Sequence, residues 1–538
     1  MKKCLCLILL LSLFTSCAAP EVVQGPVPAI TPVMVKPTKE NMLPTQHAQV
    51  TIHRQVINTV NPHIFGDNIS WRGDGYYLWD REANAPNPDL FQKLCDTGIT
   101  HLRYPGGIEG DYFNWYEAVG DERVEQIDPF SKDWPTNATQ AGERYYPYFG
   151  PDEFQSVCQA ANMEATIQFN SGTGKPEDAG SWVKHCQDNS FNVLSFTVGN
   201  EANFEFEAVE GLGVTKTAEA YIDFYEKAYA SVRQVSSDAK VGGICLPPSH
   251  PLCYRKEWDA KVLGALGDKM DFIDVHIGYA PYFNNGKSND KVIASFMAAP
   301  HWIAGLLEET KDEITRYAKK HADDIDIHIG EYGPISGGTY DNTLAGALYQ
   351  ASLFHVMLEE PKVVSANHLP VLNHYAAPNL IGSCKEASLT KGEQVVWDNA
   401  VTHVFGMYAK MSGRDVLKVD MDAPTFSADA VGLIPSIESV PYIDVAAYDR
   451  RHQGVMTVFI INRHQDESFG VDINLPYDHA KVVDVTELWH KDPLAYNNWV
   501  DTDKVAPQRL DVEAVKLSNA QMHLTIKPLS LLCIDIKY

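Results

Sequence analysis

Two glutamates stand directly after short apolar runs in well-separated parts of the chain. Glu201 ends the segment 198–201 (Val-Gly-Asn-Glu), and Glu331 lies in the segment 329–333 (Ile-Gly-Glu-Tyr-Gly). One glutamate in such a place is more often a helix cap or a loop carboxylate. Two of them match the needs of glycosidic bond cleavage, in which one carboxyl group protonates the leaving oxygen while the other, ionised, attacks or stabilises the anomeric carbon. Glu201 and Glu331 are therefore the candidate catalytic pair.

Four further polar residues follow apolar runs and could serve the same site. Arg103 precedes a Pro-Gly-Gly turn, and a guanidinium there can hold a carboxylate ionised. Asn200 directly precedes Glu201 and could bind a sugar 2-hydroxyl. His276 and Tyr279 follow another run, where an imidazole or a phenol could orient either carboxylate. The competing interpretation is a structural ion pair for Arg103 and an ordinary structural donor for His276.

The elements that must position these residues alternate from residue 63 onward. Apolar strand-like runs are followed by amphipathic segments, most clearly at 217–235, where apolar residues recur at steps of three and four. Eight such units predict an α/β fold, a (β/α)8 TIM barrel over residues 63–412. The predicted strands are 64–69, 99–104, 165–169, 193–198, 240–245, 272–277, 326–329 and 363–372.

In such a barrel the active site lies at the carboxyl ends of the strands. Glu201 follows the fourth predicted strand and Glu331 the seventh. These positions oppose each other across the barrel mouth, which allows the separation of about 5–5.5 Å that retaining glycosidases use. A wider gap would indicate an inverting enzyme instead.

After residue 413 the pattern changes to strands without helices. Several runs between 442 and 536 alternate polar and apolar residues, which predicts a C-terminal antiparallel β-sandwich over residues 413–538. The alternating stretch 49–60 precedes the barrel, and we expect it to add a strand to this second domain.

Composition restricts the possible partners. The chain has 44 basic and 70 acidic residues in 538, and a formal charge of -26 opposes binding to nucleic acid. Twenty-five Tyr and ten Trp supply aromatic faces that suit sugar rings, so a poly- or oligosaccharide is the expected substrate, although most aromatic residues serve the core. No cysteine spacing is typical of a zinc site, and we expect neither a metal nor an organic cofactor.

The N-terminus has the pattern of an export signal. A basic start, an apolar run over 5–14 and small residues before Cys17 resemble a bacterial lipoprotein signal peptide over residues 1–17, with Cys17 as the lipidation site. Residues 18–47 are rich in proline and predict an extended tether. We therefore expect a protein of the cell envelope, in the outer membrane or periplasm, that contacts the membrane only through its lipid anchor. The alternative is plain secretion.

Several motifs together resemble the α-L-arabinofuranosidases of glycoside hydrolase family 51, over about residues 49–538. The motifs are Leu-Arg-Tyr-Pro-Gly-Gly at 102–107 with Trp115, Asn-Ser-Gly-Thr-Gly at 170–174 with Trp182, the segment 198–201, His276, Gly330 with Glu331, and the stretch 344–373. The resemblance implies a retaining glycosidase that trims arabinofuranose branches from plant-type polysaccharide. It also implies Glu201 as acid/base and Glu331 as nucleophile, with Arg103, Asn200 and His276 around the sugar.

The chain departs from the family pattern in the residues expected to contact the sugar. Ile108 and Glu109 follow the Pro-Gly-Gly turn where the family usually has a sugar-binding Asn, and the first strand ends at 66–68 (Gly-Asp-Asn) where a Glu is expected. Gly-Asn-Glu-Ala-Asn replaces Gly-Asn-Glu-Met-Asp, and Gly-Glu-Tyr-Gly replaces Asp-Glu-Trp-Asn. Activity on a galactofuranoside, xylan or β-glucan therefore stays open, as does a noncatalytic glycan-binding lipoprotein. The sequence does not determine the oligomeric state.

Overall fold

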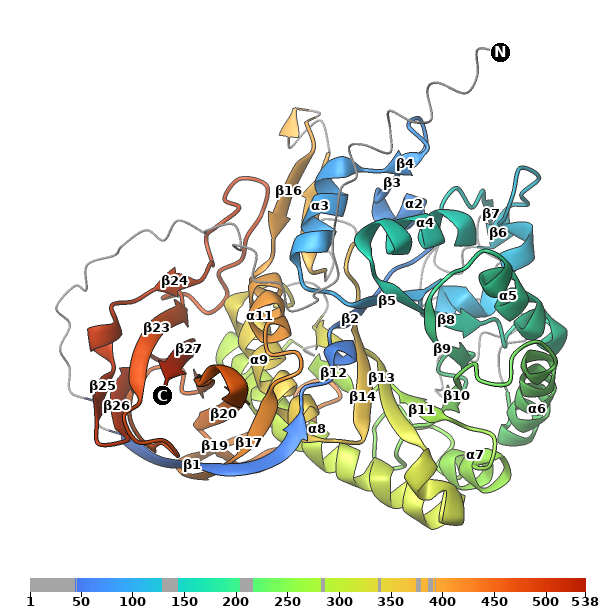
Figure 1. Ribbon diagram of the computed structural model, residues 1–538. Coiled ribbons are helices and arrows are strands. Elements are labelled where there is room, and N and C mark those ends of the chain that lie inside the picture. The colour runs from blue at the N-terminus through green and yellow to red at the C-terminus, as the bar shows by residue number, and fades with distance from the viewer. Residues whose placement is uncertain are drawn as a thin grey trace.

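Two large sheets organise the part of the chain that the structure describes (Figure 1). The computed structural model describes residue 44 and residues 46–538 except 128–143, 204–215, 282–285, 337–339, 374–378, 386–389 and 392. The first sheet is wrapped by helices, and the second, drawn mainly in orange and red, packs beside it. None of the helices in these ranges is both long enough and apolar enough to cross a membrane.

The first sheet closes into a parallel barrel. Its nine strands follow the order β11-β10-β9-β8-β5-β2-β14-β13-β12, and a further ladder between β11 and β13 closes eight of them into a ring. Each of these ladders is parallel. The ring strands are β2 (Gly66–Asn68), β5 (His101–Tyr104), β8 (Glu164–Phe169), β9 (Val193–Val198), β10 (Val241–Ile244), β11 (Phe272–Val275), β13 (Asp326–Ile335) and β14 (Val363–His368). The predicted TIM barrel is confirmed.

A helix follows each ring strand and covers the outside of the barrel (Figure 1). These helices are α3 (Pro88–Asp96), α4 (Pro151–Ala161), α5 (Pro176–Asp188), α6 (Ala218–Val235), α7 (Trp258–Leu266), α8 (Asn289–Ala318), α9 (Leu344–Glu359) and α11 (Ala400–Ala409). Helix α6 begins where the side chain of Thr217 accepts a hydrogen bond from the amide of Ala220. Its buried residues recur at helical spacing and form one apolar face: Ala218, Tyr221, Phe224, Tyr225, Ala228 and Val232.

The seventh strand is longer than the sequence pattern predicts. We expected it to end at Ile329, but β13 continues to Ile335. Its ladder with β11 ends at Ile329, and beyond Glu331 it pairs instead with β12 (Gly278–Pro281), starting at Tyr332. The second partner comes from the chain after β11, so it could not be inferred from the local sequence. Glu331 consequently lies inside a strand, between two ladders.

The second sheet has ten strands, all paired antiparallel except β1 with β22. It contains, in spatial order, β24 (Gln508–Arg509), β23 (Lys481–Leu488), β27 (Ser530–Lys537), β21 (Val455–Asn462), β20 (Ile443–Arg450), β17 (Asp415–Asp422), β1 (Gln46–Thr59), β22 (Phe469–Asn474), β26 (Gln521–Ile526) and β25 (Lys516–Ser518). Strands near the two opposite edges of this sheet contribute to one buried apolar cluster. Val485 of β23, near one edge, and Met522 of β26, near the other, both belong to it. The predicted sandwich is therefore one continuous sheet that curls so that its two halves face each other (Figure 1).

Aromatic and charged contacts fix the second sheet to the barrel. The ring of Tyr408 in α11 stacks on Phe459 in β21 with centroids 4.0 Å apart. Arg463 forms an ion pair with Asp444 and donates to the hydroxyl of Ser352 in α9 at 3.0 Å. Burial raises the pKa of Asp444, but the neighbouring cations outweigh it and hold that pKa well below its usual range. The second sheet is thus an integral support of the barrel rather than a loosely tethered module.

Candidate active site

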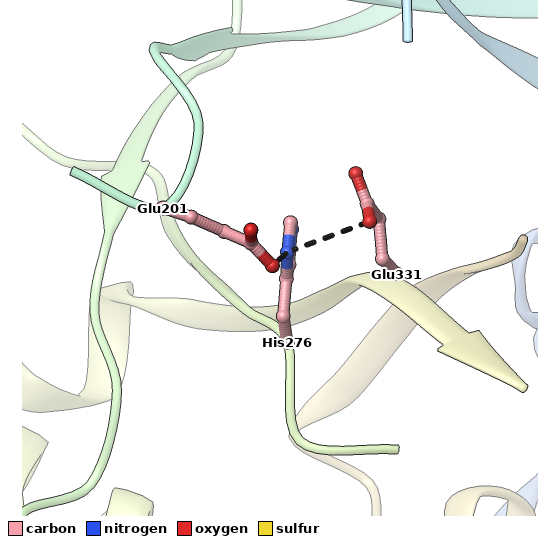
Figure 2. A group of neighbouring side chains, drawn as sticks. All are labelled: Glu201, His276 and Glu331. Carbon is pink, nitrogen blue, oxygen red and sulfur yellow. Dashed lines mark hydrogen bonds and ion pairs between the residues drawn. The ribbon is translucent and has the colours of Figure 1, made fainter. Parts of the chain in front are cut away.

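Glu201 and Glu331 converge at the carboxyl end of the barrel, with His276 between them (Figure 2). Nδ1 of His276 lies 2.6 Å from Oε1 of Glu201 and 3.9 Å from Oε2 of Glu331. One oxygen of each glutamate and one nitrogen of the histidine all lie within 4.8 Å of one another. Both glutamate residues are only 4% exposed. This close approach suits the separation of about 5–5.5 Å between the two carboxyl groups of retaining glycosidases, because it leaves no room for a water molecule between nucleophile and sugar.

Arg103 binds the base of the site from β5. Its Nη1 donates to Oε1 of Glu331 at 2.6 Å and to Oδ1 of Asn68 at 2.9 Å, while Nη2 donates to Oδ1 of Asn200 at 2.8 Å. The Arg103 side chain is fully buried. A buried guanidinium with three such acceptors is held in one orientation, and it fixes Glu331 and the residue before Glu201 relative to each other.

The hydroxyl group of Tyr279 contacts both carboxylates. Its hydroxyl lies 3.3 Å from Oε1 of Glu201 and donates a short hydrogen bond to Oε2 of Glu331. Burial raises the pKa of Glu331, but His276, Arg103 and Tyr279 together outweigh burial and lower that pKa below its usual value. Glu331 is thereby held ionised, as a nucleophile must be.

The same environment has the opposite effect on Glu201. Burial raises its pKa, and the negative charge of Glu331 adds to that rise, against the lowering effect of His276 and Arg103. The pKa of His276 is raised overall, because Glu331 and Glu201 outweigh the effect of burial. Two carboxyl groups whose pKa values are moved in opposite directions are the arrangement that acid/base catalysis needs.

A tight turn after β9 aims Glu201 into the site. Gly199 has φ +81°, and a Cβ on it would lie 2.2 Å from the hydroxyl oxygen of Ser171, so no other residue fits there. The amide of Asn200 donates to Oδ2 of Asp111 at 3.2 Å, and the amide of Ser171 donates to Oδ1 of Asp111 at 3.0 Å. Burial raises the pKa of Asp111 to about 7. Asp111 thus ties the turn to the loop after β5, and Glu201 adopts φ +41°.

Close packing beneath Glu331 directs its side chain. A Cβ on Gly330 would lie 2.0 Å from Oδ1 of Asp274, which leaves space only for glycine. The ladder between β13 and β14 is irregular between Ile329 and Tyr332, on either side of Glu331. Irregularities of this kind redirect side chains near active sites.

A cavity of about 430 Å³ opens above the two carboxylates. Its walls combine hydroxyl, amide, aromatic and charged groups with apolar side chains such as Ile108, Ile335 and Leu369, a mixture that suits a sugar with hydroxyl groups and C–H faces. The lining residues include Asn68, Ser70, Arg72, Tyr76, Gly107, Glu109, Asn200, Glu201, Tyr279, Glu331 and Asn373.

The spacing of Glu201, His276 and Glu331 would also allow them to ligate a metal ion. The positive charge of Arg103, 2.6 Å from Glu331, opposes a second cation at this point. The donor set therefore favours acid/base chemistry over metal binding.

All six catalytic and substrate-binding residues expected from the sequence meet at this site: Arg103, Asn200, Glu201, His276, Tyr279 and Glu331. The sequence analysis assigned no role to Asn68, although its amide nitrogen donates to the carbonyl oxygens of Gly330 and His368, both at 3.0 Å. It also missed Asp111, whose only signal is its position shortly after the Pro-Gly-Gly turn. Cys17 and the predicted signal peptide lie outside the described residues.

Comparison with known proteins agrees with this geometry. The family model of the α-L-arabinofuranosidase C-terminal domain matches residues 330–530. An exo-α-(1→6)-L-arabinofuranosidase of Bifidobacterium longum is 22% identical over 89% of this chain and 95% of its own length. An intracellular exo-α-L-arabinofuranosidase of Bacteroides ovatus is 23% identical over 91% of this chain and 96% of its own. The solved GH51 arabinofuranosidase of Xanthomonas axonopodis pv. citri has the same fold, with a TM-score of 0.75 at 16% identity, covering 91% of this chain and all of that one.

The barrel brings two carboxylates together, and the relatives that match most of the chain are glycosidases. The chain is therefore a glycoside hydrolase. More narrowly, the chain is similar to α-L-arabinofuranosidases, and its fold is that of the solved members of glycoside hydrolase family 51.

The predicted location is contradicted by the same comparison. A place in the cell envelope, or secretion from the cell, was expected from residues 1–47, but several relatives that match most of the chain are named intracellular enzymes. The expectation rested on a pattern of only 17 residues at the N-terminus, and the names of these relatives point the other way.

Proposed function

We propose that this protein is a retaining exo-α-L-arabinofuranosidase that removes terminal arabinofuranose from the side chains of plant-type polysaccharides or oligosaccharides. The observation that carries the proposal is the pair Glu201 and Glu331. One carboxylate oxygen of Glu201 lies within 4.8 Å of one carboxylate oxygen of Glu331, and the pKa values of the two groups are shifted in opposite directions. The names of the relatives supply the sugar and the exo mode of action.

In the first step the ionised carboxylate of Glu331 attacks the anomeric carbon, and the bond from that carbon to the leaving oxygen breaks. The proton of the Glu201 carboxyl group passes to the leaving oxygen, which departs as an alcohol. The sugar is then bound covalently to Glu331, and Glu201 is ionised. Arg103 and Tyr279 hold the Glu331 carboxylate in line with the sugar throughout.

In the second step water enters on the side that the alcohol has left. Glu201 removes a proton from the water, whose oxygen attacks the anomeric carbon and releases Glu331 as a carboxylate. Glu201 can change from acid to base because the covalent bond removes the charge of Glu331, and the loss of that charge lowers the pKa of Glu201. Two inversions at one carbon retain its configuration. Glu201 gives its proton to the leaving alcohol in the first step and regains a proton from water in the second.

The first experiment is a side-by-side assay of nitrophenyl α-L-arabinofuranoside, β-D-xyloside, β-D-glucoside and β-D-galactofuranoside. We expect the arabinofuranoside to be cleaved fastest and the first-formed sugar to keep its configuration by NMR. Preference for another glycoside would reject the proposed sugar, and an inverted product would reject the mechanism.

The variant Glu331→Gln should reduce turnover roughly a thousandfold or more, because it removes the nucleophile while conserving shape. The exposed Glu438 provides the matched control, and Glu438→Gln should retain full activity. Parent-like rates in Glu331→Gln would contradict the assignment of the nucleophile.

A further inference from the structure

One wall of the cavity is a charged and hydroxyl-bearing cluster, which consists of Ser70 and Arg72 after β2 and Glu109 after β5. Oε1 of Glu109 accepts hydrogen bonds from the hydroxyl of Ser70 at 3.1 Å and from Nη1 of Arg72 at 3.4 Å. The amide of Arg72 donates in turn to the hydroxyl oxygen of Ser70 at 3.1 Å. The three side chains therefore brace one another, and Glu109 is only 9% exposed.

This cluster lies next to the reacting centre. An ideal Cβ on Gly107 would be 3.3 Å from Oε2 of Glu109 and equally 3.3 Å from Oε1 of Glu331. Both carboxylates thus approach the same glycine. A furanose ring bound with its anomeric carbon at Glu331 is only a few ångströms wide, so its ring substituents come within reach of Glu109.

We propose that Glu109 determines the specificity of the enzyme by accepting hydrogen bonds from free hydroxyl groups of the terminal sugar. This inference rests on the proposed function, in which Glu331 forms a bond to that sugar. A carboxylate only accepts hydrogen bonds, so it selects hydroxyl groups as donors and discriminates against methylated or deoxy sugars.

The substrate class that follows is a terminal sugar whose hydroxyl groups are unsubstituted. Arg72 donates hydrogen bonds only, and its half-buried side chain adds a donor for a ring or aglycone oxygen beside Glu109.

The test combines the variant Glu109→Gln with a series of aryl glycosides in which each hydroxyl group of the sugar is replaced in turn by hydrogen. The parent glycoside is the one that the wild-type enzyme cleaves fastest. We expect Glu109→Gln to lower kcat/KM for the parent by roughly tenfold to hundredfold, the usual effect of losing a hydrogen bond to a charged group. One deoxy glycoside should suffer a similar loss with the wild-type enzyme, and Glu109→Gln should then cause little further loss with that glycoside.

An equal loss from Glu109→Gln on every glycoside in the series, or no loss at all, would overturn the proposal. The exposed Glu122 provides the control variant Glu122→Gln, which should behave like the wild type. A purely structural effect would lower the melting temperature and reduce all rates in parallel, without the dependence on one hydroxyl group.

The outcome separates this inference from the proposed function. If the fastest substrate is another neutral glycoside, the arabinofuranose assignment fails, and the same series made from that glycoside still tests Glu109. If no glycoside is cleaved, calorimetric titration of the free sugars and their deoxy forms into wild-type and Glu109→Gln protein tests the contact directly. If wild-type and Glu109→Gln protein bound each sugar and its deoxy form with equal affinity, the proposed contact of Glu109 with a sugar hydroxyl group would be rejected.

Discussion

Removal of the Tyr279 hydroxyl tests how the site keeps Glu331 ionised. In Tyr279→Phe the ring remains, but Oε2 of Glu331 loses a short hydrogen bond inside a pocket where Tyr279 is 5% and Glu331 4% exposed. A hydrogen bond to a charged group contributes about 1.5–3 kcal/mol. Because this bond stabilises the carboxylate and not the protonated acid, its loss raises the pKa of Glu331.

The sign of the effect on the pH profile follows from that change. At pH values below the pKa of Glu331, most of this residue is protonated in both the wild type and the variant. In that range kcat/KM is proportional to the small fraction of enzyme in which Glu331 is ionised. The variant should therefore be slower there by roughly tenfold to hundredfold, the factor that corresponds to about 1.5–3 kcal/mol. Nearer the optimum, where Glu331 is ionised in both proteins, the difference should shrink, and the acidic limb should move to higher pH.

The assay is kcat/KM for an aryl glycoside measured across the acidic limb, with Tyr254→Phe as control, since Tyr254 is 61% exposed. The reasoning is refuted if the acidic limb of Tyr279→Phe stays in place or moves to lower pH. A loss of the same size at every pH would indicate misplacement of the carboxylates rather than a change in their ionisation.

Three further variants test other parts of the site. Glu201→Ala should spare bond cleavage with an activated phenol leaving group but slow release of the covalent sugar, which a burst of nitrophenol would reveal; parent-like steady-state rates would contradict its role as base. Gly330→Ala places a Cβ against Asp274 and should cost about 1–3 kcal/mol of unfolding free energy with a large loss of kcat; an unchanged melting temperature would show that the site is not tightly packed. Asp111→Asn should lower kcat more than it raises KM, because Asn has one acceptor oxygen for the two amides of Ser171 and Asn200, and an unaltered kcat would exclude this positioning role.

The sequence alone was sufficient to predict the barrel and to propose Glu201 and Glu331 as a catalytic pair. Strand and helix periodicity are local properties, so eight alternating units and the two glutamates after apolar runs could be recognised without tertiary information. The carboxyl ends of parallel strands meet at one edge of a barrel, and this rule brings Glu201, Glu331, Arg103 and His276 together before any distance is known.

The tertiary structure decided how these residues are held and which neighbours complete the site. Two hydrogen bonds illustrate this. Asn68 donates to the backbone beside Glu331, and the amide of Asn200 donates to Asp111. Both join segments far apart in the chain, and they form only because the barrel closes. The approach of Glu109 to the reacting centre depends on the conformation of a glycine turn. Such contacts carry no periodic signal, because they arise from the packing of loops whose geometry is set by the whole fold.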